Sequence, residues 1–125
     1  MSTEPRLLQG IPVLPSTDLE ASLSFYETKL GFRRHIDSDD YAGVERDGVQ
    51  IHLWLCDDRS ISERTSCRIN MSGVDTLFAL CRDRGAVDPD ATIEEQPWGF
   101  REFSVRDPSG NVVIFAEEIP GWVEE

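Results

Sequence analysis

One order of structural signals occurs twice along this chain of 125 residues. In residues 7–56 an apolar segment precedes a helical pattern, two short strand patterns and a strand that follows a tight turn at Asp47-Gly48. Residues 65–118 repeat this order, with the second turn at Asp107-Pro108-Ser109-Gly110. A βαβββ unit present twice explains the pattern. It predicts a single α+β domain over residues 1–125, with two curved mixed sheets that form a cleft.

The two helices are predicted from stripes of apolar residues at helical spacing. The first stripe consists of Leu19, Leu23, Tyr26 and Leu30, and the second of Val74, Leu77, Phe78 and Cys81. Thr17 and Glu20 fit a capping box at the start of the first helix. Gly31 and Gly85 follow the two stripes, which is a typical way for a helix to end.

The strand over residues 49–55 has two different faces. Alternation places Val49, Ile51, Leu53 and Leu55 on one face, and Gln50, His52 and Trp54 on the other. Other strands are predicted over residues 7–14, 32–36, 41–45, 66–71, 101–105 and 111–117. Pro12 interrupts the first of these, so that strand is expected to lie at an edge or to bend.

The charge balance excludes some classes of partner. The chain has 24 acidic and 12 basic residues, a formal net charge of −12. Nucleic-acid binding needs clustered Lys and Arg, and anionic lipid also attracts basic segments, so neither partner is expected. Acidity favours a cationic ligand, although it also serves solubility alone.

The location predicted from the sequence is the cytoplasm. No run approaches the roughly 20 apolar residues that cross a membrane, and residues 1–6 show no signal-peptide pattern. The three cysteines, Cys56, Cys67 and Cys81, have irregular spacing and form neither a disulfide framework nor a CxxC metal site.

Several motifs resemble those of one protein superfamily. They are Ile11-Pro12-Val13-Leu14, Ser24-Phe25-Tyr26, Leu30-Gly31-Phe32, Asp40-Tyr41-Ala42-Gly43-Val44, Gln96-Pro97-Trp98-Gly99, Arg101-Glu102-Phe103 and Arg106-Asp107-Pro108-Ser109-Gly110-Asn111. From about Leu7 to Glu118 the chain resembles the glyoxalase/bleomycin-resistance/dioxygenase superfamily, which has the vicinal oxygen chelate fold. It is most similar to the drug-binding, bleomycin-resistance branch.

The resemblance also gives a way to separate an enzyme from a binding protein. Enzymes of the superfamily hold a divalent metal through ligands that correspond to positions near Ile11, His52, Ser66 and Ile114. Metal ligation needs His, Asp, Glu or Cys, and among these four residues only His52 qualifies. A shift of one residue would add Cys67 but no carboxylate. We therefore expect no metal and no cofactor.

Without a metal, the cleft is predicted to be an aromatic and apolar binding site. The strand patterns and the resemblance together nominate eight ligand-binding residues: Ile36, Tyr41, Gln50, His52, Trp54, Arg68, Trp98 and Ile114. Aromatic rings stack on planar heterocycles and attract cations. Arg68 runs against this pattern, because it would repel a cationic group; it can instead pair with an anion or stack on a ring.

The resemblance implies that the N-terminal strand crosses to a second copy, with Pro12 as the hinge of a homodimer. The implied function is metal-free sequestration of a bleomycin-type glycopeptide antibiotic without modification. The alternatives are a glyoxalase- or dioxygenase-like enzyme of the same fold, with His52 or Glu102 in acid–base roles, and a sensor or interaction subunit that takes no small ligand.

Overall fold

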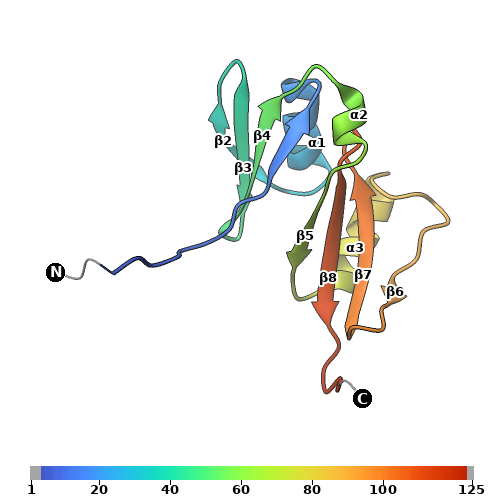
Figure 1. Ribbon diagram of the computed structural model, residues 1–125. Coiled ribbons are helices and arrows are strands. Elements are labelled where there is room, and N and C mark those ends of the chain that lie inside the picture. Colours follow the sequence, from blue (N-terminus) through green and yellow to red (C-terminus); the bar gives the residue numbers. More distant parts are fainter. Residues whose placement is uncertain (1–3, 124–125) are drawn as a thin grey trace.

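The first half of the chain forms a four-stranded sheet with one helix in the computed structural model, which describes residues 4–123 (Figure 1). Its elements are β1 (Val13–Ser16), α1 (Leu19–Thr28), β2 (Arg33–Asp37), β3 (Tyr41–Arg46) and β4 (Val49–Leu55). The strand order is β1-β4-β3-β2, with β1 parallel to β4 and the other pairs antiparallel. Asp47 and Gly48 both have positive φ, as a two-residue hairpin turn requires.

The second half repeats this architecture. Its elements are β5 (Ser66–Asn70), α3 (Val74–Asp83), β6 (Glu94–Glu95), β7 (Phe100–Arg106) and β8 (Val112–Glu118). The order β5-β8-β7-β6, with β5 parallel to β8, corresponds strand for strand to that of the first sheet. The short helix α2 (Arg59–Ser62) joins the two modules. The predicted α+β class and the βαβββ repeat are therefore confirmed.

Each sheet has one face covered by its own helix, and in Figure 1 both α1 and α3 lie behind the strands. Leu23 and Tyr26 of α1 are buried together with Ile51 and Leu53 of β4. The second helix buries the four residues predicted for its stripe. We call the opposite, helix-free side of each sheet its open face. Tyr41, Gly43, Gln50, His52 and Trp54 belong to the first open face, and Arg68, Phe100, Glu102, Ser104 and Ile114 belong to the second.

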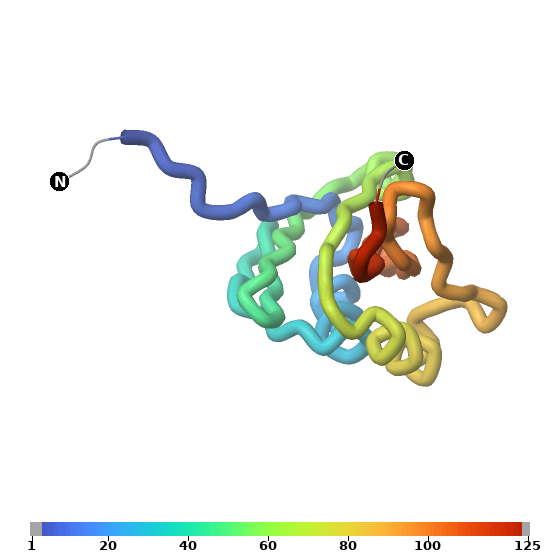
Figure 2. Tube along the Cα trace, turned by 90° about the horizontal axis from the view of Figure 1, so that it is seen from below, coloured from blue at the N-terminus to red at the C-terminus, as the bar shows by residue number. Residues whose placement is uncertain are grey.

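An extended N-terminal arm, residues 4–12, leaves the body of the molecule (Figures 1 and 2). Leu7 and Leu8 on this arm are 98% and 85% exposed. The strand predicted over residues 7–14 lies at an edge of its sheet, as expected, but β1 begins only at Val13, so the prediction was wrong for residues 7–12. The Pro12 carbonyl still accepts a 2.9 Å hydrogen bond from the His52 amide. Pro12 therefore stands where the chain leaves the sheet.

The start of α1 also differs from the prediction. The N-cap is Asp18, whose carboxylate accepts a 3.1 Å hydrogen bond from the Ala21 amide. Thr17 instead donates its backbone N–H to the Ser109 hydroxyl of the second module, and Glu20 pairs with Arg34. The capping box was wrong because both of its residues have partners elsewhere in the fold.

Two elements were not predicted. The helix α2 and the strand β6 have only four and two residues, too few to show a period in the sequence. Within residues 4–123, no helix combines the length and apolar character needed to span a membrane.

Candidate functional site

A chain of hydrogen bonds runs across the open face of the first sheet. The Gln50 amide oxygen lies 3.0 Å from His52 Nε2 and 3.2 Å from His35 Nε2. Because this oxygen only accepts, both ring nitrogens donate to it. His52 Nδ1 then accepts from the Tyr41 hydroxyl, at 2.8 Å. The chain Tyr41–His52–Gln50–His35 thus fixes His52 as a neutral imidazole with its proton on Nε2.

The surroundings of His52 favour the same neutral form. Burial lowers the pKa of His52 below its usual value, and the nearby His35 ring lowers it further. The two rings lie 5.8 Å apart, centre to centre. At neutral pH His52 therefore presents an uncharged ring whose two nitrogens are bonded to Gln50 and Tyr41.

A β-bulge and a glycine allow these side chains to gather. The pairing of β2 with β3 shifts register between Arg34 and Ile36, which re-aims His35 toward the open face. A Cβ on Gly43 would come within 3.0 Å of Ile36, 3.1 Å of His52 and 3.2 Å of His35. Because glycine has no Cβ, position 43 leaves room for these three side chains to come together over the strand.

Two tryptophans predicted for the site lie in different places. Trp54 is directly opposite Tyr41 in the β3–β4 ladder and belongs to the first open face. Trp98 lies in the turn before β7, and it is half exposed. The neighbouring Gly99 has φ of +89° and lies under the ring of Trp122. Trp98 is therefore associated with the second sheet.

The open face of the second sheet carries an ion pair. Arg68 and Ile114 are register partners on β5 and β8. The Arg68 guanidinium reaches Glu102 on β7, with Nη1 2.8 Å from Oε2, and it lies 4.9 Å from the centre of the Phe100 ring. Arg68 thus lies on the open face as a neutralised cation, with Glu102 as its ion-pair partner.

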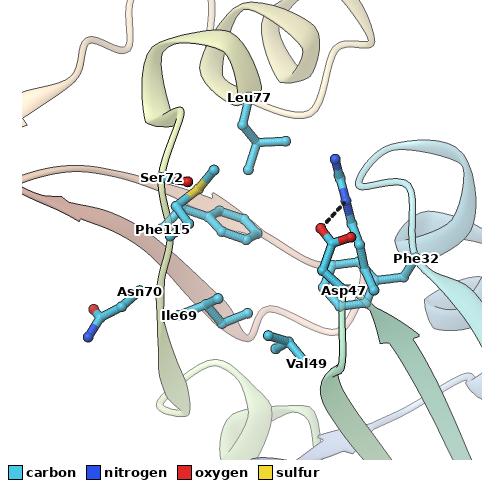
Figure 3. Close-up of a pocket in the computed structure, with 10 residues that line it drawn as sticks. Phe32, Asp47, Val49, Ile69, Asn70, Ser72, Leu77 and Phe115 are labelled. Carbon is cyan, nitrogen blue, oxygen red and sulfur yellow. Dashed lines mark ion pairs between the residues drawn. The ribbon is translucent and has the colours of Figure 1, made fainter.

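A cavity of about 330 Å³ lies elsewhere, between the β3–β4 turn and the β5–α3 segment (Figure 3). Its walls include Phe32, Val49, Ile69, Leu77 and Phe115, and the Arg46–Asp47 ion pair lies beside it. None of the eight predicted ligand-binding residues lines this cavity. It is a gap between the modules on the side of the apolar core, separate from the open faces.

The comparisons with known proteins identify the family. Residues 10–115 match the model of the glyoxalase/bleomycin resistance protein/dioxygenase superfamily. The chain belongs to this superfamily. A bleomycin resistance protein of Geobacillus stearothermophilus is 32% identical over 90% of this chain and 98% of its own length, and one from Staphylococcus aureus matches equally well.

A solved structure gives the same assignment. The bleomycin-binding protein of Streptomyces verticillus, complexed with copper(II)-bleomycin, is 31% identical and superposes with a TM-score of 0.82 over 90% of this chain and 97% of that one. A bleomycin resistance determinant encoded on transposon Tn5 has a TM-score of 0.79 at 22% identity, which shows the shared fold.

The residues at the superfamily's metal positions do not fit a metal. The positions that the resemblance assigns to metal ligands hold Ile11, His52, Ser66 and Ile114, so that set contains one imidazole and no carboxylate. Ser66 and Ile114 lie on neighbouring strands, where Ser66 pairs with Val112 and Ile114 with Arg68. Within residues 4–123 no three His, Cys, Asp or Glu side chains gather closely enough to hold a metal ion. We derive no metal-dependent chemistry for this member of the superfamily.

The sequence prediction and the observed clusters overlap only in part. Tyr41, Gln50 and His52 lie together, with Ile36 and Trp54 beside them, whereas Arg68, Ile114 and Trp98 belong to the second sheet. In the part of the chain that the structure describes, no hydrogen bond or ring contact joins the two groups. His35 is exposed, as predicted, but its hydrogen bond to Gln50 was not predicted, because no sequence signal marks the bulge. Phe100 was missed, although alternation with Glu102 and Ser104 places all three on one face.

Proposed function

We propose that this protein binds a bleomycin-type glycopeptide and sequesters it without changing it chemically. The observation that carries the proposal is the match over nearly the whole chain, at 31% identity, to a protein whose structure was solved with copper(II)-bleomycin. Curated relatives of similar identity are bleomycin resistance proteins. The donor set at the superfamily's metal positions supports binding over metal-dependent catalysis.

The open faces have the chemistry that such a ligand needs. Exposed faces of Tyr41, Trp54 and Trp98 offer flat surfaces on which planar heteroaromatic rings stack. Gln50 and neutral His52 add polar groups, and Ile36 and Ile114 add apolar contact area. With Arg68 these are the eight residues that we assign to ligand binding.

We also propose that the site is completed in a homodimer. One chain divides the eight residues between its two sheets and the turn before β7, so a single copy does not surround a ligand with both groups. The N-terminal arm carries two exposed leucines and leaves the body at Pro12. Exchange of this arm about Pro12 would join two copies at little structural cost.

We further propose that each chain acts as one domain of two modules. Its unpaired cysteines fit a location in the cytoplasm.

A titration tests the proposed function. Copper(II)-bleomycin is added to the protein while tryptophan fluorescence is followed, and we expect a saturable change at micromolar drug with one drug per chain. W54F and W98F show which ring reports the binding. Prior treatment with EDTA leaves binding of metal-free bleomycin unchanged. Absence of a saturable change contradicts the proposal.

The fate of the drug separates binding from catalysis. After prolonged incubation with a small amount of protein, the drug is recovered and its mass is measured. We expect the intact mass, because sequestration breaks no bond. Conversion of many drug molecules per chain would instead show an enzyme of this superfamily.

A further inference from the structure

Glu102 on β7 is a carboxylate that is largely removed from water. Its side chain is only 11% exposed. Oε2 is fully buried, and within the described residues it accepts no well-aligned hydrogen bond, even though Arg68 Nη1 lies 2.8 Å away. The two groups are therefore held by charge, while the acceptor capacity of the oxygen is unused. A buried acceptor in this state favours a partner that aims N–H groups directly at it.

An aromatic ring stands beside this carboxylate. Phe100 lies two residues before Glu102 on the same strand, so both side chains belong to the second open face. The Arg68 guanidinium carbon lies 4.9 Å from the ring centre of Phe100, within the range of a cation–π contact. One position on this face is thus flanked by a ring and a carboxylate, the two groups that together recognise a planar cation.

Arg68 reaches this position across the open face, from the strand at the edge of the sheet. It starts on β5, an edge strand, and its partner Glu102 is on β7, with β8 between them. Glu102 pairs in register with Ala116 of β8, which has a small side chain that leaves room for the guanidinium to cross. Arg68 remains 35% exposed, so it can turn into solvent without opening the core.

The charge around the position is negative. Glu94 is the register partner of Glu102 on β6, and Glu118 is the register partner of Phe100 on β8. Directly paired residues share a face, so both carboxylates add to the potential there. Arg101 is held elsewhere by Asp75, at 2.7 Å, and does not offset it.

We propose that Phe100 and Glu102 form a subsite for a planar organic cation, a guanidinium or an amidinium, and that Arg68 occupies this subsite while no ligand is bound. This inference rests on the proposed function in one respect: both place part of a ligand on the open face of the second sheet. Arg68 makes the contacts that the ligand cation would make, and it must leave before that cation enters. Only molecules in which Arg68 has left the subsite can bind the ligand cation. The apparent affinity of the protein for that cation is therefore lower than the affinity of the empty subsite.

Small probes test this subsite without the drug. Benzamidine carries a planar amidinium, benzamide is its neutral counterpart and benzoate its anionic one. Each is titrated into the protein while backbone amide resonances of β5 and β7 are followed by NMR. We expect saturable shifts at Phe100 and Glu102 with benzamidine, and none with benzamide or benzoate.

Three variants test the roles of the side chains. R68Q removes the resident cation and is expected to tighten benzamidine binding by about fivefold. E102Q keeps the shape of the side chain and is expected to weaken binding by about tenfold or more. R64Q is the control, because Arg64 is exposed and has no side-chain partner among the described residues; its affinity should equal that of the unmodified protein.

Two results would overturn the inference. Unchanged or weaker benzamidine binding in R68Q means that Arg68 does not compete for the subsite. Shifts caused by benzoate and abolished by R68Q mean that Arg68 itself receives an anion. These readouts are independent of bleomycin: benzamidine binding without drug binding would refute only the proposed function, and drug binding without benzamidine binding would refute only the subsite.

Discussion

The hydroxyl of Tyr26 donates a 2.8 Å hydrogen bond to Oδ2 of Asp107, across 81 positions of the chain. Tyr26 belongs to α1 of the first module, and Asp107 begins the turn between β7 and β8 of the second. The buried Asp107 carboxylate also accepts hydrogen bonds from the Ser109 and Asn111 amides and from Asn111 Nδ2. Four donors thus compensate for the removal of this charge from water. The same turn binds the first module again through Asn111 and the Pro15 carbonyl, at 2.7 Å.

Removing this hydroxyl should weaken the junction between the modules. Burial and the charge of Asp107 raise the pKa of Tyr26 well above its usual value, so the phenol remains a donor at any working pH. Y26F deletes one of the four donors and should lower the free energy of unfolding by about 1–3 kcal/mol, measured by urea denaturation. Y41F is the matched control. Tyr41 is partly exposed, so water replaces its hydrogen bond and the loss should be smaller. Equal losses would show that Asp107 does not depend on Tyr26.

A methyl group at position 43 should disturb the first open face. G43A places a Cβ against Ile36, His35 and His52 at 3.0–3.2 Å, so these side chains must move. We expect stability to fall by about 1–3 kcal/mol and the dissociation constant for bleomycin to rise by about tenfold. G10A is the control, since a Cβ there meets nothing within 4 Å. Unchanged drug binding in G43A would place the ligand away from this face.

The exposed leucines of the arm should matter for assembly. Replacing Leu8 with Glu puts a charge where we propose that the arm meets a second copy, and the dimer dissociation constant should rise by about tenfold or more. Sedimentation velocity at several concentrations measures this change. L80E is the matched control, because Leu80 is also an exposed leucine but lies on α3, away from the arm. If both variants sediment like the unmodified protein, the arm does not hold the dimer together.

The fold followed from the sequence where the signals were local and repeated. The stripe of Val74, Leu77, Phe78 and Cys81 predicted the buried face of α3, and Asp47-Gly48 predicted the hairpin, because each depends on residues a few positions apart. Thr17 misled because its true partner, Ser109, is 92 positions away. A residue such as Thr17 can cap its own helix or bond to a distant segment. The local sequence reveals the possible cap but not the distant partner.

The site was harder to predict for the same reason. Alternation along β4 placed Gln50 and His52 on one face correctly. His35 joined them through a bulge, which changes the face of a side chain without a mark in the sequence. The contact of Arg68 with Glu102 crosses an intervening strand, so it depends on the strand order β5-β8-β7 and not on any spacing. The charge of Arg68 was visible in the sequence, but its neutralisation was not.

Protonation of His52 gives the last prediction. Its pKa is lowered mainly by burial and secondly by His35, so the unfolded chain holds a proton at this residue more readily than the folded protein does. Stability therefore falls as pH drops through the ordinary histidine value, and the loss is complete below the folded pKa. In NMR titrations the His52 ring should titrate below about 6.5. H35Q should move the midpoint only part of the way back, because burial remains. In urea denaturation, H52Q should lose less stability than the unmodified protein between about pH 7.5 and pH 5. A midpoint at or above the ordinary value would contradict the neutral, Nε2-protonated His52 of the hydrogen-bond chain.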